Sequence, residues 1–260
     1  MNWVLPELLA LLFAFITFAI SLEIGFRIGV RKLAHADEPT RTHANTLYTA
    51  ALGLLALLIG FTFAMSVSRF ETRKALMVDQ ANAIGTAALR ASVLPAEQAA
   101  RAAVLFAEYV RTRFDYNASL SGSDALNAAE SRAGTLENEL WALGRTELQA
   151  DPRSQPASLY LQALNEVFDL REKRRFALDD QVPTAVIVLL FAVAVVALAL
   201  IAYSCGLSGR RRLPANLTFA FLIALVFIII LDIDRPRQGF VRVSDASLVR
   251  LQQSLAAPPK

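Results

Sequence analysis

The residue types that bind metal ions or carry out nucleophilic catalysis are few in this sequence. Its two histidines, His35 and His43, share a short polar stretch with Asp37 and Glu38, and imidazole together with carboxylate forms ligand sets for divalent metals. No second cluster follows, and neither the HExxH zinc pattern nor a glycine-rich phosphate loop occurs in the sequence. Cys205, the single cysteine, has no evident base partner and excludes an intrachain disulfide. We therefore expect no catalytic residues, no metal and no cofactor, and the sequence does not favour an enzyme.

The composition instead favours a membrane protein. Of the 260 residues, 55% are hydrophobic, and the mean hydropathy is +0.43, which is too apolar for an ordinary soluble domain. The net charge of +3 suits the basic flanks of membrane helices, and we expect no nucleic-acid partner. Four apolar runs reach the roughly 20 residues that a helix needs to cross a bilayer. They cover residues 4–25, 47–67, 183–205 and 217–233.

The first apolar run has no basic residue before it and is longer than the apolar part of a signal peptide, so we interpret it as a retained anchor. Four spans place the N-terminus, the segment 68–182 and the C-terminal tail on one side of the membrane. The predicted fold class is all-α, with four transmembrane helices and a membrane-proximal antiparallel helical bundle between the second and third spans. The predicted parts are the first two transmembrane helices with a short loop (1–67), the extramembrane four-helix bundle (68–182), the last two transmembrane helices (183–234) and a polar C-terminal tail (235–260).

The segment 68–182 has a helical apolar period throughout. A heptad-like seam continues out of the second span through Phe70, Met77, Ile84 and Ala91, with Lys74, Ala81 and Ala88 between them. Since no proline falls within 47–93, we expect that range to be one helix. Turns near Pro95, near 117–123 and near Pro156 separate three further helices over 95–116, 124–149 and 157–181. Four extramembrane helices, an even number, return the chain to the bilayer for the third span.

Ionisable residues gather where the apolar runs end on the side of the bundle, and a charge at the bilayer rim costs less when it is paired or hydrated. They are Glu7, Arg69, Glu71, Asp232, Asp234 and Arg235. We predict a boundary ion pair between Arg69, which leaves the second span, and Asp232 or Asp234, which end the fourth. The alternative is that each side chain reaches the lipid headgroups by itself. Near the other end of the first span, we expect Glu23 to pair with Arg27 rather than to relay protons.

Two segments resemble a known family. Residues 60–70, GFTFAMSVSRF, resemble the second transmembrane helix of bestrophin anion channels, which carries Gly-Phe, several apolar residues and then Ser/Thr-Arg-aromatic at this spacing. Residues 234–239, DRPRQG, resemble the bestrophin Asn-Pro-Phe-Gly turn. Over nearly its full length, the chain is identified as a member of a bacterial bestrophin-like membrane family without an assigned function. The segments that carry this resemblance are SRFETRKALMVDQANAIGTAALRASVLP and LDIDRPRQGFVRVS.

The resemblance implies a homo-oligomer, a pentamer whose second helices surround a central pore for an inorganic anion. Phe61 matches a constriction phenylalanine of bestrophins. Where bestrophins place bulky apolar residues one and two turns earlier, this chain has Leu57 and Gly53, so any hydrophobic gate is shorter here. The alternative for Phe61 and Leu57 is packing between helices. Residues 240–244, FVRVS, replace the acidic calcium-binding run of bestrophins, so calcium control does not carry over.

Orientation and function each keep two interpretations. The short loops 26–46 and 206–213 are basic, which favours a bundle outside the cytoplasm. The resemblance implies a cytoplasmic bundle on a bacterial inner membrane, and we adopt it. The leading function is an oligomeric bestrophin-like ion channel whose second span lines the pore at Gly53, Leu57 and Phe61. The alternative is a non-conducting membrane scaffold or sensor whose bundle binds a partner. The expected partners are membrane lipid, further copies of the chain and an inorganic anion.

Overall fold

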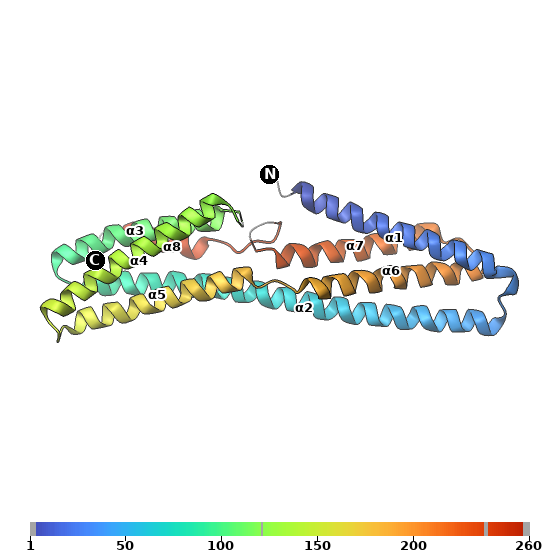
Figure 1. Ribbon diagram of the computed structural model, residues 1–260, viewed down its shortest axis with the longest axis horizontal. Coiled ribbons are helices and arrows are strands. Elements are labelled where there is room, and N and C mark those ends of the chain that lie inside the picture. Colours follow the sequence, from blue (N-terminus) through green and yellow to red (C-terminus); the bar gives the residue numbers. More distant parts are fainter. Residues whose placement is uncertain (1–3, 121, 237–238, 257–260) are drawn as a thin grey trace. The chain divides into compact units, whose positions relative to one another are not determined.

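The protein is helical throughout the computed structural model, which describes residues 4–120, 122–236 and 239–256 (Figure 1). These ranges contain no β-strand, which confirms the predicted all-α class. A short 3-10 turn, η1 (Leu33–His35), follows the first helix. The helices are α1 (Val4–Lys32), α2 (Glu38–Ala91), α3 (Ala96–Ala118), α4 (Asp124–Ala150), α5 (Gln155–Asp179), α6 (Thr184–Leu207), α7 (Leu213–Asp234) and α8 (Ala246–Ala256).

The helices form two compact units, each with an apolar core of its own. The first unit comprises residues 4–68, 181–235 and 239–241. The second unit comprises residues 69–120, 122–180, 236 and 242–256. Helix α2 contributes to both, because the division falls between Ser68 and Arg69.

Helix α2 runs without a break for 54 residues, which confirms the prediction of one helix over most of 47–93. It begins earlier than expected, at Glu38, where the carboxylate of Asp37 accepts the backbone N–H of Thr40 at 3.0 Å. Pro39 lies in the first turn, where its missing N–H costs nothing. The helix ends at Ala91, shortly before Pro95, the residue that precedes α3.

In the first unit, α1 and α6 approach closely because small residues face each other. Ser21, Gly25 and Gly29 lie one turn apart on α1. A Cβ atom added at Gly25 would lie 2.1 Å from the carbonyl oxygen of Ala199, and one added at Gly29 would lie 2.3 Å from that of Tyr203. The hydroxyl of Ser21 donates to a backbone carbonyl of α6 at 2.6 Å. Small residues at every fourth position allow this contact and are common between membrane helices.

Side chains from four helices meet in the core of the first unit. The ring of Phe18 on α1 stacks on Phe191 of α6 at 5.2 Å, and Phe191 meets Phe227 of α7 edge-on at 5.7 Å. Leu55 of α2 is buried in the same core. Figure 1 shows α1, α6 and α7 running alongside one another.

Four helical stretches of the described residues are long and apolar enough to cross a membrane. They are Glu7–His35, Glu38–Ala91, Gln155–Leu207 and Leu213–Asp234. The third stretch is broken at residues 180–183, and its apolar part is α6, since α5 carries many charged residues. The apolar runs predicted as spans thus fall in α1, α2, α6 and α7.

The core of the second unit is built from the end of α2 and from α3, α4, α5 and α8. The heptad pattern predicted from Phe70 to Ala91 is largely confirmed as a buried line, since Met77, Ile84 and Ala91 are buried. Of the line between them, Ala81 is buried and Ala88 packs against the core, whereas Lys74 is exposed and Arg73 is buried in its place. The predicted apolar stripes of α3, α4 and α5 also face this core, with Phe106, Leu140 and Leu164 among the fully buried side chains.

Local capping explains where α4 and α5 begin. The hydroxyl of Ser123 accepts the N–H of Leu126 at the start of α4, and the hydroxyl of Ser154 accepts the N–H of Ala157 at the start of α5. Serine at this position satisfies a backbone donor that has no partner within the helix. These starts lie within a few residues of the predicted ones.

Helix α8 was not expected, because its segment was interpreted as part of a polar tail. Leu248 and Leu251 of this helix are buried, and Leu251 lies beside Gly85 of α2. The carboxylate of Asp245, just before α8, accepts a hydrogen bond from the amide of Asn117 at 2.6 Å. Residues 246–256 therefore complete the core of the second unit.

Candidate functional site

The three residues predicted to line a pore lie together on an exposed face of α2. Gly53, Leu57 and Phe61 follow one another at steps of one helical turn, and all three are exposed. The exposed fraction is 55% for Leu57 and 67% for Phe61. A Cβ atom added at Gly53 would meet nothing within 4 Å. This face is opposite the buried side of the helix, where Leu55 packs into the core of the first unit.

The exposed face continues along the whole of α2 with a repeat of seven residues. We call this line the α2 seam. A seven-residue repeat is the pattern by which one helix contacts another in a supercoil. From Leu47 to Ser68 this face carries no charged side chain, so that part can contact another helix without burying a charge, whereas the exposed Glu71 and Asp79 lie beside the later members of the seam. Its exposed members are Leu47, Leu54, Phe61, Ser68, Ala75, Asn82 and Leu89.

The residues predicted to form a boundary ion pair have other partners within their own units. Arg69 pairs with Asp180, with 3.2 Å between nitrogen and oxygen. One turn further along α2, Arg73 donates to the backbone carbonyls of Ala177 and Asp180 at 2.9 and 2.8 Å. These two arginines hold the end of α5 against α2. A pair between Arg69 and an aspartate of α7 would join the two units, and it stays a prediction.

Asp232 and Asp234 organise backbone turns in the first unit. The carboxylate of Asp234 accepts the N–H of Val182 at 3.0 Å, and that of Asp232 accepts the N–H groups of Phe240 and Val241 at 2.8 and 2.9 Å. Gly239 has a φ of +118°, and a Cβ there would lie 2.1 Å from the carboxylate of Asp232. In the segment that carries the family resemblance, the buried carboxylate of Asp232 therefore holds the turn at residues 239–241, and that of Asp234 holds the backbone that precedes α6. Residues 237 and 238 of this segment lie outside the described residues.

Two glutamates of α1 form ion pairs near the ends of that helix. The predicted pair of Glu23 with Arg27 is confirmed at 2.7 Å, and the other carboxylate oxygen of Glu23 accepts from Arg211 at 2.7 Å. Glu7 is buried and pairs with Arg235 at 2.9 Å. The pairs of Glu23 with Arg211 and of Glu7 with Arg235 tie α1 to the residues just before and just after α7.

A group of polar side chains, here called the polar core, is enclosed between α3, α4 and α5. Its members are Tyr109, Arg113, Glu130, Glu137 and Arg171. Glu137 accepts hydrogen bonds from the hydroxyl of Tyr109 and from Arg171, both at 2.7 Å. The side chain of Arg113 is only 1% exposed, lies 5.3 Å from the centre of the Tyr109 ring and is 3.9 Å from Glu130. The ring of Tyr109 and the carboxylate of Glu130 thus stabilise the charge of this buried guanidinium.

Burial determines the proton affinity of two members of the polar core. It raises the pKa of Tyr109 above its ordinary value, because the phenolate would be poorly solvated. Burial also raises the pKa of Glu137, although the hydrogen bond from Tyr109 and the charge of Arg171 oppose the shift. Sequence analysis missed this group. The available signal was ionisable residues at core spacing, since Arg113 follows Tyr109 by one turn and Glu137 follows Glu130 by two.

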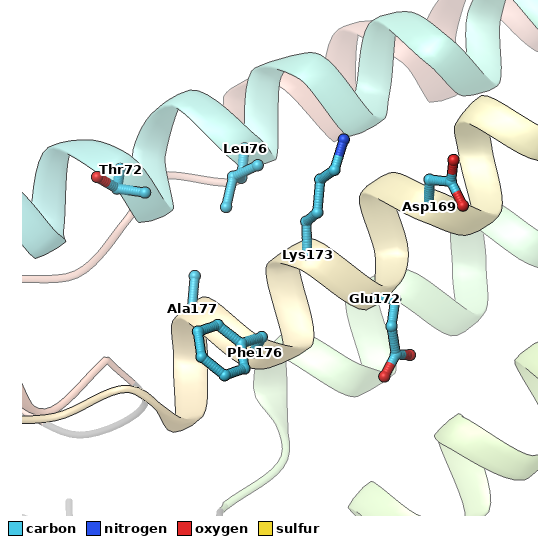
Figure 2. Close-up of a pocket in the computed structure, with 7 residues that line it drawn as sticks. All are labelled: Thr72, Leu76, Asp169, Glu172, Lys173, Phe176 and Ala177. Atoms are coloured by element: carbon cyan, nitrogen blue, oxygen red, sulfur yellow. The ribbon is translucent and has the colours of Figure 1, made fainter.

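An open groove of about 720 Å³ lies between α2 and α5 in the second unit. Figure 2 shows Lys173 and Ala177 of α5 pointing toward α2 and Leu76 of α2 pointing toward α5, with the Phe176 ring in front of α5. Phe176 is 75% exposed. The combination of an apolar floor with a charged rim is typical of surfaces that contact other proteins.

The histidine-containing segment considered first has no metal-like arrangement in the described residues. His35 and His43 are both exposed. No group of three or more His, Cys, Asp or Glu side chains in the described ranges could hold a metal ion. Cys205 is half-buried on α6, with the amide of Asn216 at 3.9 Å from its sulfur.

The helical fold and the four apolar helices define a membrane-type helical protein, with an uncharged exposed seam along its longest helix. A model of the Bestrophin-like domain matches residues 4–248. The chain therefore belongs to the Bestrophin-like family. Comparison with the curated proteins gave no match.

Solved structures share the fold over almost the full chain. A crystal structure of a bacterial Bestrophin homolog from Klebsiella pneumoniae has 16% sequence identity and a TM-score of 0.67, with 96% of this chain and 97% of that chain covered. A second crystal structure of a bacterial Bestrophin homolog from Klebsiella pneumoniae has 14% identity and a TM-score of 0.63, with 91% and 96% covered. A crystal structure described as a membrane protein has 15% identity and a TM-score of 0.66, with 96% and 97% covered. The bestrophin fold is thus retained at low sequence identity.

Proposed function

We propose that the protein is an oligomeric ion channel in which α2 lines the pore and an inorganic anion is the permeant species. The observation that carries the proposal is the first part of the α2 seam, from Leu47 to Ser68, where the exposed face of the helix carries no charged side chain. Membership of the Bestrophin-like family supports the same function, because the bestrophins that the sequence resembles are anion channels.

Exposure alone does not distinguish a pore from a lipid-facing surface, since Phe13 on α1 is as exposed as Phe61, at 67%. Two further features favour a contact between copies of α2. Gly53 and Gly60 have open space where a side chain would lie, so another helix can approach closely. The seam also continues beyond the apolar part of α2 with small residues such as Ala75, beside the exposed Glu71 and Asp79, and a purely lipid-facing line does not require this continuation.

In a ring of subunits, the side chain of Phe61 forms the main hydrophobic constriction and Leu57 the second. A ring of bulky apolar side chains excludes water from a narrow pore and so blocks ions until the pore widens. Gly53 contributes no side chain, so the pore is wider one turn beyond Leu57. This places the barrier at Leu57 and Phe61 only.

The proposed channel lies in a bacterial inner membrane as a multi-pass protein. Helices α1, α6 and α7 and the first part of α2 cross the bilayer, as their length and apolar composition allow. The end of α2 together with α3, α4 and α5 forms an antiparallel four-helix bundle in the cytoplasm. Because α2 is one helix, a movement of this bundle is transmitted to the constriction directly.

The oligomeric state provides the first test. The full chain is solubilised in mild detergent and its stoichiometry is measured by light scattering and single-particle imaging. A ring of subunits with a central path along α2 is expected. A monomer or dimer would contradict the channel and favour the non-conducting scaffold.

Halide flux into liposomes tests conduction, with two phenylalanines of the same helix as a matched pair. Phe61→Ala removes the proposed constriction and should increase the flux. Phe63→Ala changes a residue that is 41% exposed and lies about 200° away around the helix, and it should leave the flux near the wild-type value. Equal effects of both substitutions, or no flux in the wild-type protein, would contradict the proposal.

A further inference from the structure

Six exposed basic residues gather where α1 ends and where α6 turns into α7. We call them the basic cluster. Three lie in the last two turns of α1, and three are consecutive in the turn before α7. At this density, lysine and arginine create a strong local positive potential. The members are Arg27, Arg31, Lys32, Arg210, Arg211 and Arg212.

Specific contacts bring the two halves of the basic cluster together. Glu23 accepts hydrogen bonds from both Arg27 and Arg211 at 2.7 Å. The guanidinium of Arg211 also lies 5.3 Å from the centre of the Phe26 ring on α1. Gly209, with a φ of +67°, allows the tight turn that lies beside the end of α1. The cluster is therefore a defined surface of the first unit and not a set of unrelated side chains.

The other four members of the basic cluster form no ion pair within the part of the chain that the structure describes. At the opposite end of α7, by contrast, Arg235 is paired with the buried Glu7. The first unit thus neutralises a cation at one end and leaves several cations available at the other. These cations can bind an anionic group from outside the chain.

An apolar stripe leads from the membrane part of α1 to the basic cluster. Ile20, Ile24 and Ile28 follow one another at steps of one turn and are 54%, 52% and 43% exposed. On the same face, the next turn carries Arg31 and Lys32. Apolar side chains followed by cations along one line match the shape of a phospholipid, whose acyl chain continues from its phosphate.

We propose that the basic cluster binds the phosphate of an anionic phospholipid, whose acyl chain lies along Ile28, Ile24 and Ile20. The proposal rests on the membrane placement of α1, α6 and α7 proposed above, but not on conduction along α2. Free phosphate can interact with the cations alone, whereas the apolar stripe favours the lipid. The interaction is electrostatic at the headgroup and weakens as ionic strength rises.

Lipid titration of the full chain in mild detergent, followed by native mass spectrometry, tests the proposal. Phosphatidylglycerol is compared with phosphatidylcholine of the same acyl chains and with inorganic phosphate as a competitor. The wild-type protein is expected to bind phosphatidylglycerol more tightly than phosphatidylcholine, with little competition by phosphate.

Removing charges that form no ion pair among the described residues tests the site without disturbing the fold. The combined substitutions R31Q, K32Q and R212Q should weaken phosphatidylglycerol binding by on the order of 100-fold, at about fivefold for each basic residue near the headgroup. R212Q alone should give about a fivefold loss. The matched control combines R101Q, R111Q and R145Q, three exposed arginines of the second unit, and should leave binding unchanged.

Three results would overturn the lipid site: equal binding of the two lipids, full retention of phosphatidylglycerol binding by the triple variant, or complete displacement by inorganic phosphate. Halide flux is measured separately in liposomes. If the wild-type protein conducts no halide but still prefers phosphatidylglycerol over phosphatidylcholine, the channel is contradicted and the lipid site is supported. If the wild-type protein conducts halide but binds the two lipids equally, the lipid site is contradicted and the channel is supported.

Discussion

Replacing Gly25 by alanine should push α1 away from α6. The added Cβ would lie 2.1 Å from the carbonyl oxygen of Ala199 and 2.9 Å from its Cα atom, whereas a carbon–oxygen contact needs roughly 3.3 Å. Because the obstructing atoms belong to the backbone of α6, no rotamer change can relieve the clash. The two helices must separate by roughly 1 Å, and overpacking of this kind costs about 1–3 kcal/mol.

The single cysteine provides the assay. Cys205 is half-buried on α6, so its reaction with a thiol-specific fluorophore during heating reports the opening of the first unit. A loss of about 1–3 kcal/mol corresponds to a fall of roughly 2–12 °C in the unfolding midpoint for a chain of this size. The substitution also improves helix propensity by up to about 1 kcal/mol, which works against the clash.

Gly134→Ala measures the gain in helix propensity apart from the clash. Gly134 lies within α4, and a Cβ there would meet nothing within 4 Å. This substitution has the same gain in helix propensity without a clash, so the unfolding midpoint of the second unit, followed by circular dichroism because Cys205 lies in the first unit, should stay constant or rise. If Gly25→Ala behaved in the same way, the close approach of α1 and α6 would be refuted.

The remaining predictions concern one buried phenol, one helix and one turn. Because burial raises the pKa of Tyr109, the folded protein keeps a proton that the unfolded chain loses above about pH 10. The free energy of unfolding therefore falls as the pH rises beyond that value. Chemical denaturation at a series of alkaline pH values should show a smaller fall for Tyr109→Phe than for the wild-type protein. The same dependence of unfolding free energy on pH in both proteins would contradict the burial of Tyr109. Leu248→Ala should lower the stability of the second unit by about 2–5 kcal/mol, whereas Val249→Ala, at a position that is 40% exposed, should change it by less than about 0.5 kcal/mol; equal effects in urea denaturation would show that α8 does not pack on the core. Asp234→Ala leaves the buried N–H of Val182 without its acceptor and should cost about 1–3 kcal/mol in the cysteine-labelling assay, and a wild-type midpoint would refute this role.

Much of the candidate site was accessible from the sequence because it lies on one helix. The spacing of Gly53, Leu57 and Phe61 already places them on one face, and the absence of proline predicts an unbroken α2. Their exposure depends on which side of α2 packs into the core, and the buried Leu55 on the opposite face decides it. The structure was therefore required to show which face of α2 is exposed and which is buried.

The pairing of charges could not be predicted in the same way. Arg69 and Asp180 are far apart in the sequence, and their contact depends on how the end of α5 packs against α2. The same holds for Arg113 and Glu130, which α3 and α4 bring together inside the polar core. From the sequence, Arg69 is predicted to pair with Asp232 or Asp234, and no local pattern indicates the contact between Arg113 and Glu130.

The sequence by itself determined the helices and the apolar stretches that can cross a membrane, because helix formation and amphipathic period depend on residues a few positions apart. Only the tertiary structure decided which small residues meet, which carboxylates accept which donors, and that residues 246–256 return to the second unit as α8. Those outcomes depend on the rotation and axial position of each helix relative to the others. Many residues set these two quantities jointly, and no local pattern records them.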